Sequence, residues 1–317
     1  MNKFLHNRLF LLIVTIGLIT FLAACGNNDD STAPQDDTKS SDVVIDSSKG
    51  EFTIPQDTKQ ILAPYHEDTL LALGVKPVAK WAIGQSVQDY LEPEMKELPT
   101  IEWNLPLEQV LSHEPDLIIL ESNLDSYEGS YDDYNKIAPT YVMTEETTSD
   151  WRKQLEVFGQ ILGKEDEATQ AIKEYDDTVA DAKAQLEEAI GDETVAIIWT
   201  TGDQFFVFEK DRHSAEVLYS ELGVQIPTLI EELGEAALQW SPISIEKLSE
   251  LDADHVILLA EEGEQGLQTL ENSDVWNSTP AAQNGNVYIL NDASNWTNKG
   301  LISSEKTIKD LLDTLVK

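Results

Sequence analysis

The sequence of 317 residues contains a single cysteine, Cys25. One cysteine cannot form a disulfide within the chain, so a disulfide framework is excluded. Positive charge is also scarce, because 21 Lys and Arg stand against 59 Asp and Glu and give a net charge of −38. A chain this acidic is not expected to present the basic surface that nucleic-acid binding requires. We therefore expect no nucleic-acid partner.

Motifs of the common catalytic sites are missing as well. The sequence has no G-x-S-x-G nucleophile elbow, no glycine-rich phosphate loop and no H-E-x-x-H zinc motif. Of its five histidines only His66 and His213 could reach a cleft, and two scattered histidines are too few for a histidine-rich metal site. We expect the protein not to be an enzyme, with no catalytic residues, no metal ligated by its own side chains and no cofactor.

The chain has only one long apolar run, and it lies at the N-terminus. Lys3 and Arg8 precede an apolar segment from Leu9 to Leu22, and the small residues of Leu22-Ala-Ala-Cys25 end it. This order predicts a signal peptide over residues 1–24, and the segment is short for a membrane span. The tetrapeptide resembles the cleavage site of bacterial lipoproteins, which implies that Cys25 becomes the lipid-modified first residue.

Beyond the signal peptide the composition predicts a tether and a large folded region. Residues 25–49 are almost entirely polar and indicate a flexible tether. The remaining chain is long enough for one large or two ordinary hydrophobic cores. Its longest predicted element is a helix from Lys164 to Ile190, roughly 38 Å long. Its apolar residues recur at helical spacing: Ala168, Ile172, Tyr175, Val179, Ala182, Leu186 and Ala189.

Short apolar strands alternate with helical segments on both sides of this helix. The alternation predicts βαβ units and mainly parallel sheets. The two sides also align with each other: residues 105–120 match residues 243–258, placing Glu108 on Glu246, and residues 67–75 match residues 216–224. We therefore expect an α/β fold in which two similar lobes, residues 50–163 and 191–317, are joined by one helix, residues 164–190.

The loops that follow the predicted strands supply the candidate binding residues. Ligands of open parallel sheets bind beyond the carboxyl ends of the strands, and these loops are rich in aromatic and neutral polar side chains. Such side chains suit a bulky, partly apolar small molecule, although burial in the core is the commoner environment for any single Trp. The candidates are Tyr65, His66, Trp81, Gln85, Trp103, Thr200, Gln204, Trp240, Trp296 and Lys299.

Several segments together resemble the iron-siderophore-binding lipoproteins of bacterial ABC importers. They are the lipoprotein signal, Ala63–Val78 (APYHEDTLLALGVKPV), Pro115–Ile119, Lys136–Thr140 (KIAPT) and Ser244–Asp254. The resemblance implies two Rossmann-like lobes on one long helix, the class III periplasmic-binding-protein arrangement, with little closure on ligand. It also implies a monomer, lipid-anchored on the extracellular face of a Gram-positive cell membrane, that delivers a ferric siderophore to ABC permease subunits.

The resemblance also suggests residue roles. Family members dock on their permease through one glutamate from each lobe, which points to Glu67 and Glu216, with Asp68 and Glu221 as near alternatives. Many members place arginines after the first strand of the second lobe, where this chain has Trp199-Thr-Thr-Gly202. The basic residues that could replace them are Arg212, Lys210, Arg152, Lys80 and Lys299. So little positive charge favours a neutral or cationic ferric hydroxamate, with the iron held by the siderophore.

Two alternatives remain open from the sequence. The first is a binding protein for haem or another metal chelate such as cobalamin, in which Tyr65 or His66 would ligate haem iron directly. The second, of a different class, is an extracytoplasmic enzyme or a signalling receptor.

Overall fold

The computed structural model describes residues 43–237 and 239–316. The predicted signal peptide and Cys25 lie outside the described residues. The first element is a hairpin in which β1 (Val44–Ser47) pairs antiparallel with β2 (Gly50–Thr53). The expected tether is therefore too long, because its last residues form a strand. Phe52 anchors this hairpin by packing its ring against Tyr141, at 5.4 Å between centroids.

The first lobe contains two small three-stranded sheets. One sheet has the order β3-β7-β8, all parallel, and the other pairs β4 parallel with β6 and antiparallel with β5. These strands are β3 (Ile61–Leu62), β4 (Lys80–Ile83), β5 (Gln85–Ser86), β6 (Thr100–Glu102), β7 (Leu117–Leu120) and β8 (Thr140–Val142). All four residues of β7 are buried, as its uninterrupted apolar sequence predicts.

Short helices connect and cover these strands. They are α2 (Glu67–Ala72), η1 (Asp89–Leu91), α3 (Glu92–Met95), α4 (Leu107–Ser112), α5 (Tyr131–Ile137) and α6 (Glu145–Ser149). Helix α5 begins with a capping box between Ser130 and Asp133, a local signal that fixes its start.

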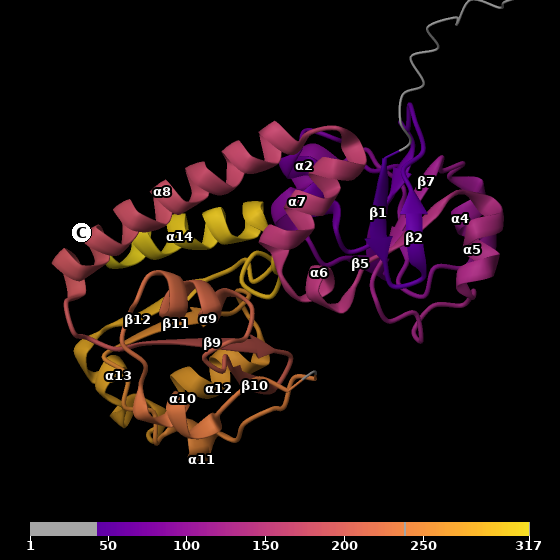
Figure 1. The fold of residues 1–317 in the computed structure, drawn as a ribbon. Coiled ribbons are helices and arrows are strands. Elements are labelled where there is room, and N and C mark those ends of the chain that lie inside the picture. Colours follow the sequence, from indigo (N-terminus) through magenta and orange to yellow (C-terminus); the bar gives the residue numbers. More distant parts are fainter. Residues whose placement is uncertain (1–42, 238, 317) are drawn as a thin grey trace, which may run out of the picture. The chain divides into compact units, whose positions relative to one another are not determined.

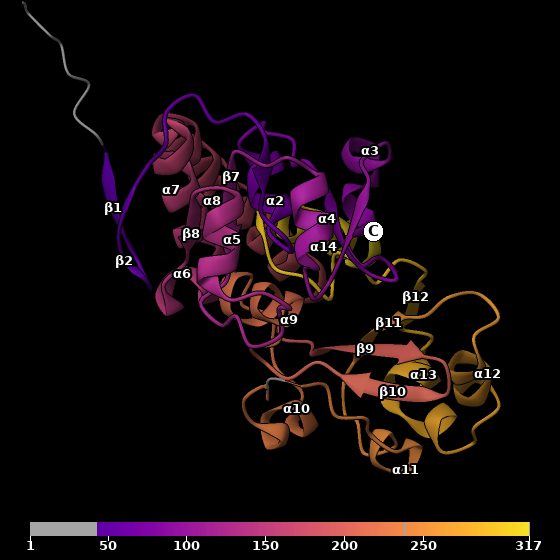
Figure 2. The same ribbon diagram turned by 90° about the vertical axis from the view of Figure 1, so that its right-hand side faces the viewer.

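The second lobe is built on one four-stranded sheet of order β10-β9-β11-β12. Strands β9, β11 and β12 are parallel, and β10 runs antiparallel to β9 (Figure 2). The strands are β9 (Val195–Thr201), β10 (Gln204–Val207), β11 (His255–Leu259) and β12 (Val287–Leu290). The helices are α9 (Ser214–Glu216), the π-helical turn η2 (Val217–Glu221), α10 (Thr228–Leu233), α11 (Ile245–Leu248), α12 (Gln265–Glu271), η3 (Trp276–Ser278) and α13 (Pro280–Asn284).

The long helix α8 (Glu165–Ile190) confirms the predicted connection between the lobes. Two further helices, α7 (Trp151–Leu162) and α14 (Leu301–Leu315), pack against it, and α14 lies along α8 in Figure 1. Because α14 also packs against α2 of the first lobe, the end of the chain adds a noncovalent connection to the covalent one. Within the described ranges, no helix is long and apolar enough to span a membrane.

Asp68 joins α2 to the start of α14. Its carboxylate accepts hydrogen bonds from the backbone N–H groups of Ile302 and Ser303, at 3.1 and 3.0 Å, and from the Tyr90 hydroxyl at 2.9 Å. Burial raises the pKa of Asp68 to about 6, and these hydrogen bonds work against that rise. A carboxylate at a helix N-terminus satisfies backbone donors that the helix itself leaves unpaired.

Candidate ligand-binding site

The carboxyl ends of the first-lobe strands carry an aromatic surface. Tyr65 follows β3 with a left-handed backbone (φ 69°), and its ring meets the Trp81 ring of β4 edge-on at 5.1 Å. The Trp81 indole N–H donates to the backbone carbonyl of Trp103 at 3.2 Å, and Trp103 is 44% exposed. Three of the aromatic residues selected from the sequence therefore lie together.

Glu67 lies beneath this surface and supports it. Its Oε1 accepts a hydrogen bond from the backbone N–H of Trp81 at 2.7 Å, while Gln88 donates to the Tyr65 carbonyl at 3.1 Å. Glu67 is fully buried, and this burial raises its pKa to about 8, so the carboxyl is mostly protonated at neutral pH. The prediction that Glu67 docks on a permease is wrong, because a surface partner cannot reach it.

His66 and Glu121 lie next to one another at the same edge. The Gln154 side chain donates to the Thr148 carbonyl at 3.0 Å, which directs its Oε1 towards His66 Nδ1 at 3.1 Å. Because Gln154 Oε1 can only accept, His66 Nδ1 carries a hydrogen. His66 Nε2 then lies 3.6 Å from Glu121 Oε1, at the carboxyl end of β7.

The second lobe has its own aromatic cluster, centred on Trp240. The Trp240 ring contacts the rings of Phe208, Trp199, His213 and Phe206, at centroid distances of 4.9, 5.4, 5.7 and 5.8 Å. The Arg212 guanidinium lies 4.3 Å from the Trp240 centroid. It is also paired with Glu209 and donates to the Ala237 carbonyl at 2.9 Å. Arg212 is 4% exposed and committed to these partners, so the prediction that it binds ligand is not supported by its position.

The other predicted residues of the second lobe differ in their exposure. The Thr200 hydroxyl is 1% exposed and donates to Glu264 Oε2 at 2.5 Å, so it holds the loop rather than facing solvent. Gln204 on β10 is exposed, as is Gln85 on β5 of the first lobe. Trp296 is completely buried in the hydrophobic core. The prediction that Trp296 contacts ligand is wrong, and its position follows the usual preference of Trp for burial.

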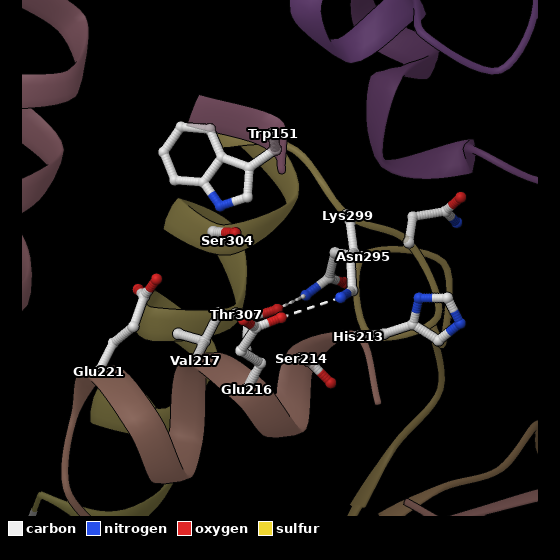
Figure 3. Close-up of a pocket in the computed structure, with 11 residues that line it drawn as sticks. Trp151, His213, Ser214, Glu216, Val217, Glu221, Asn295, Lys299, Ser304 and Thr307 are labelled. Carbon is white, nitrogen blue, oxygen red and sulfur yellow. Dashed lines mark hydrogen bonds and ion pairs between the residues drawn. The ribbon is translucent and has the colours of Figure 1, made fainter. Parts of the chain in front are cut away.

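A small polar cavity lies beside Lys299, whose ammonium pairs with Glu216 Oε2 at 2.9 Å (Figure 3). The cavity is lined by Trp151, His213, Ser214, Glu216, Val217, Glu221, Asn295, Asn298, Lys299, Ser304 and Thr307. Burial, followed by the charges of Lys299 and Arg212, lowers the pKa of His213 to about 4, so this imidazole is neutral at neutral pH. The cavity volume is about 10 Å³, room for about one water molecule, so it is far too small to hold a siderophore-sized ligand.

Comparison with known proteins agrees with this architecture. A family model described as periplasmic binding protein matches residues 62–293. The chain belongs to the periplasmic binding protein family. The iron(3+)-hydroxamate-binding protein FhuD of Bacillus subtilis is 28% identical over 309 residues, covering 95% of each chain. The probable siderophore-binding lipoprotein YfiY of the same organism is 26% identical over 326 residues, covering 98% of each.

Solved structures show the same fold. A FhuD fold-family component of a ferrichrome ABC transporter from Bacillus subtilis has a TM-score of 0.71 at 25% identity, covering 86% of this chain and 99% of that one. FhuD2 from Staphylococcus aureus with bound ferrioxamine B has a TM-score of 0.69 at 22% identity, covering 81% and 98%. This periplasmic binding protein therefore has the two-lobe α/β fold with one linking helix that its sequence predicts.

The basic residues that could replace the family's arginines offer little free positive charge to an anionic ligand. Four of the five basic residues are ion-paired: Arg212 with Glu209, Lys80 with Glu92, Lys299 with Glu216, and Arg152 with both Asp176 and Glu221. Across the described residues, no group of three or more His, Cys, Asp or Glu side chains is placed to hold a metal ion.

The sequence-based selection left out several residues of the site in this periplasmic binding protein. Glu121 directly follows the apolar run of β7, and this position at the carboxyl end of a strand was the available signal. Trp199 and Phe206 belong to strands β9 and β10 and contact Trp240 through side chains. The partners that neutralise the basic residues, such as Glu209 for Arg212, carry no motif.

Proposed function

We propose that this protein is an extracytoplasmic binding lipoprotein that captures a ferric siderophore of the hydroxamate type and delivers it to an ABC permease. The observation that carries the proposal is the pair of aromatic surfaces described above, which have little unpaired positive charge. The names of the similar Bacillus subtilis proteins support the same ligand class.

The proposed ligand lies between Trp81 with Tyr65 of the first lobe and Trp240 with Trp199 of the second. Large aromatic rings offer apolar contact area to the organic shell of a siderophore, and the phenol and indole groups can hydrogen-bond to its oxygens. The siderophore itself holds the iron, so no protein ligand to the metal is needed. A neutral or cationic complex fits best, because burying an anion without an unpaired cation is costly.

Titration of tryptophan fluorescence tests this proposal. A ferric trihydroxamate should quench the fluorescence with a saturable curve, and haem and cobalamin should not. Trp81→Leu should weaken binding about tenfold or more, because Trp81 lies on the proposed contact surface. The control Trp276→Phe alters a Trp that is 4% exposed on η3, and it should leave the affinity unchanged. Saturable quenching by haem alone would favour a haem-binding protein instead.

We propose that the permease is engaged by Glu108 and Glu246 instead of Glu67 and Glu216. The internal repeat aligns these two residues, and each is exposed in the first turn of its helix, α4 or α11. Exposed carboxylates suit pairing with arginines on a partner. The proposal includes a monomeric protein held at the outer face of a Gram-positive membrane through a lipid on Cys25.

A further inference from the structure

We propose that Glu121, together with the phenol rings of Tyr65 and Tyr127, forms a subsite for a protonated amine on the siderophore. This inference rests on the proposed function, because it names the charge class of the ligand that the same edge of the first lobe accepts. The protein would then select ferric hydroxamates that carry a free ammonium group over those that lack one.

The position of Glu121 supports this subsite. It follows the buried strand β7 directly, at the carboxyl edge of a parallel sheet where ligands of this fold class bind. Its side chain is 30% exposed, so the carboxylate is open to solvent and to ligand. Its charge reaches both neighbouring phenols: after burial, Glu121 is the largest cause of the raised pKa of Tyr65, to about 12, and of Tyr127.

His66 provides the second observation. Its ring is 6% exposed, and Nε2 finds no hydrogen-bond partner among the described residues although it lies 3.6 Å from Glu121 Oε1. Since Nδ1 donates its hydrogen to Gln154, Nε2 is the ring nitrogen that can accept a hydrogen bond, and it lies beside a carboxylate. His66 Nε2 and the Glu121 carboxylate are thus two hydrogen-bond acceptors side by side, and an ammonium group would supply the hydrogen-bond donors for both.

The surrounding charges leave this position available to a cation. Glu67, the other carboxyl group near these rings, is mostly protonated at neutral pH and hydrogen-bonded to Trp81. Lys80, on the strand that also carries Trp81, is paired with Glu92 at 2.7 Å. The rings of Tyr65 and Tyr127 add the electron-rich faces that attract alkylammonium groups. An anionic arm here would instead be repelled by Glu121.

A matched pair of ligands tests the inference on the wild-type protein. The first is ferrioxamine B, a linear trihydroxamate with a free terminal amine, and the second is the same complex after acetylation of that amine. We expect the amine-bearing complex to bind about tenfold more tightly, the size of one partly exposed charge-assisted contact. Glu121→Gln should reduce this ratio to about one by weakening only the amine-bearing ligand. The control Glu188→Gln removes an exposed charge from α8 and should keep the ratio.

The outcomes separate the inference from the proposed function. Equal affinity of the wild-type protein for the two ligands, or an unchanged ratio in Glu121→Gln, would overturn the subsite while leaving hydroxamate capture in place. Failure of both ligands to bind would overturn the proposed function and the subsite with it. The wild-type ratio needs no variant, so it remains decisive even where Glu121→Gln fails to fold.

Discussion

Glu67 illustrates how one residue can support a binding surface without touching solvent. Its neutral carboxyl group holds the backbone of Trp81, and its pKa of about 8 lies well above the ordinary value of 4.5 because the group is buried. Between about pH 4.5 and pH 8 the folded protein therefore keeps a proton that the unfolded chain has already released. The stability contributed by this proton is fully present below pH 4.5 and is lost by about pH 8.

The variant Glu67→Gln removes this titration while preserving the acceptor for Trp81. In urea unfolding at pH 5, 7 and 9, we expect the wild-type protein to lose stability relative to Glu67→Gln as the pH increases. Glu67→Ala should be less stable than Glu67→Gln by about 1–3 kcal/mol at every pH, because it removes the acceptor of the Trp81 N–H. Parallel pH profiles of the wild type and Glu67→Gln would show that Glu67 is ionised in the folded protein.

Residue types and their order in the sequence predicted which aromatic residues gather in the first lobe but not how each is buried. Tyr65, Trp81 and Trp103 could be selected because they follow or end predicted strands. The burial of Glu67 and Trp296 could not, since it depends on contacts between segments far apart in the sequence. The pairing of Arg212 could not be predicted for a different reason: its partner Glu209 is local but belongs to no sequence motif.

The close approach of α2 to the start of α14 requires glycine at position 300. A Cβ atom on Gly300 would lie 2.3 Å from Cγ of Asp68, closer than any real contact. The φ of Gly300 is 162°, an extended backbone that other residues adopt, so the constraint is steric. Gly300→Ala should therefore separate the Asp68 carboxylate from the N–H groups of Ile302 and Ser303 and destabilise the protein by about 1–3 kcal/mol.

Thermal unfolding measures this loss, and Ser303→Ala is the matched control. That variant keeps the backbone N–H that Asp68 binds and loses a hydroxyl that bonds to the Gly300 carbonyl and to Tyr90, so its cost should be about 1 kcal/mol. A second readout is the radius of gyration with and without ligand, which should change more in Gly300→Ala because α14 then connects the lobes less firmly. If Gly300→Ala were as stable as Ser303→Ala, the contact would not hold the two helices together.

Elements with strong local patterns were the ones that the sequence predicted well. Helix α8 matches its predicted range within one residue because an apolar face repeats over its whole length, and β7 matches because it is continuously apolar. The β1–β2 hairpin was missed, since its residues are mostly polar and its stability comes from the packing of Phe52 on Tyr141. The π-helical turn η2 has no sequence signal that separates it from an α-helix.

For the whole molecule, the internal repeat was the most informative feature of the sequence. It predicted two α/β lobes on one helix, and the sheets on either side of α8 confirm that arrangement. The repeat could not show that α14 returns to contact α2, because that packing joins segments far apart in the sequence. The proposed function has both lobes meeting one permease, so residues repeated between the lobes are the candidates for contacts with it.

Glu108 and Glu246 are repeated between the two lobes, and both are exposed. In cells that depend on this protein for ferric hydroxamate, the double variant Glu108→Gln/Glu246→Gln should reduce iron uptake about tenfold or more, while the dissociation constant of the ligand stays within about twofold. The loss is expected because two exposed carboxylates on α4 and α11 would no longer pair with arginines of the permease. Glu216→Gln tests the other exposed candidate in parallel, and Glu188→Gln controls for lost charge. The dissociation constant of the ligand reports on capture alone, so a change in uptake at constant affinity reports on docking. Normal uptake by the double variant, or loss of uptake with Glu216→Gln alone, would place the docking contact elsewhere.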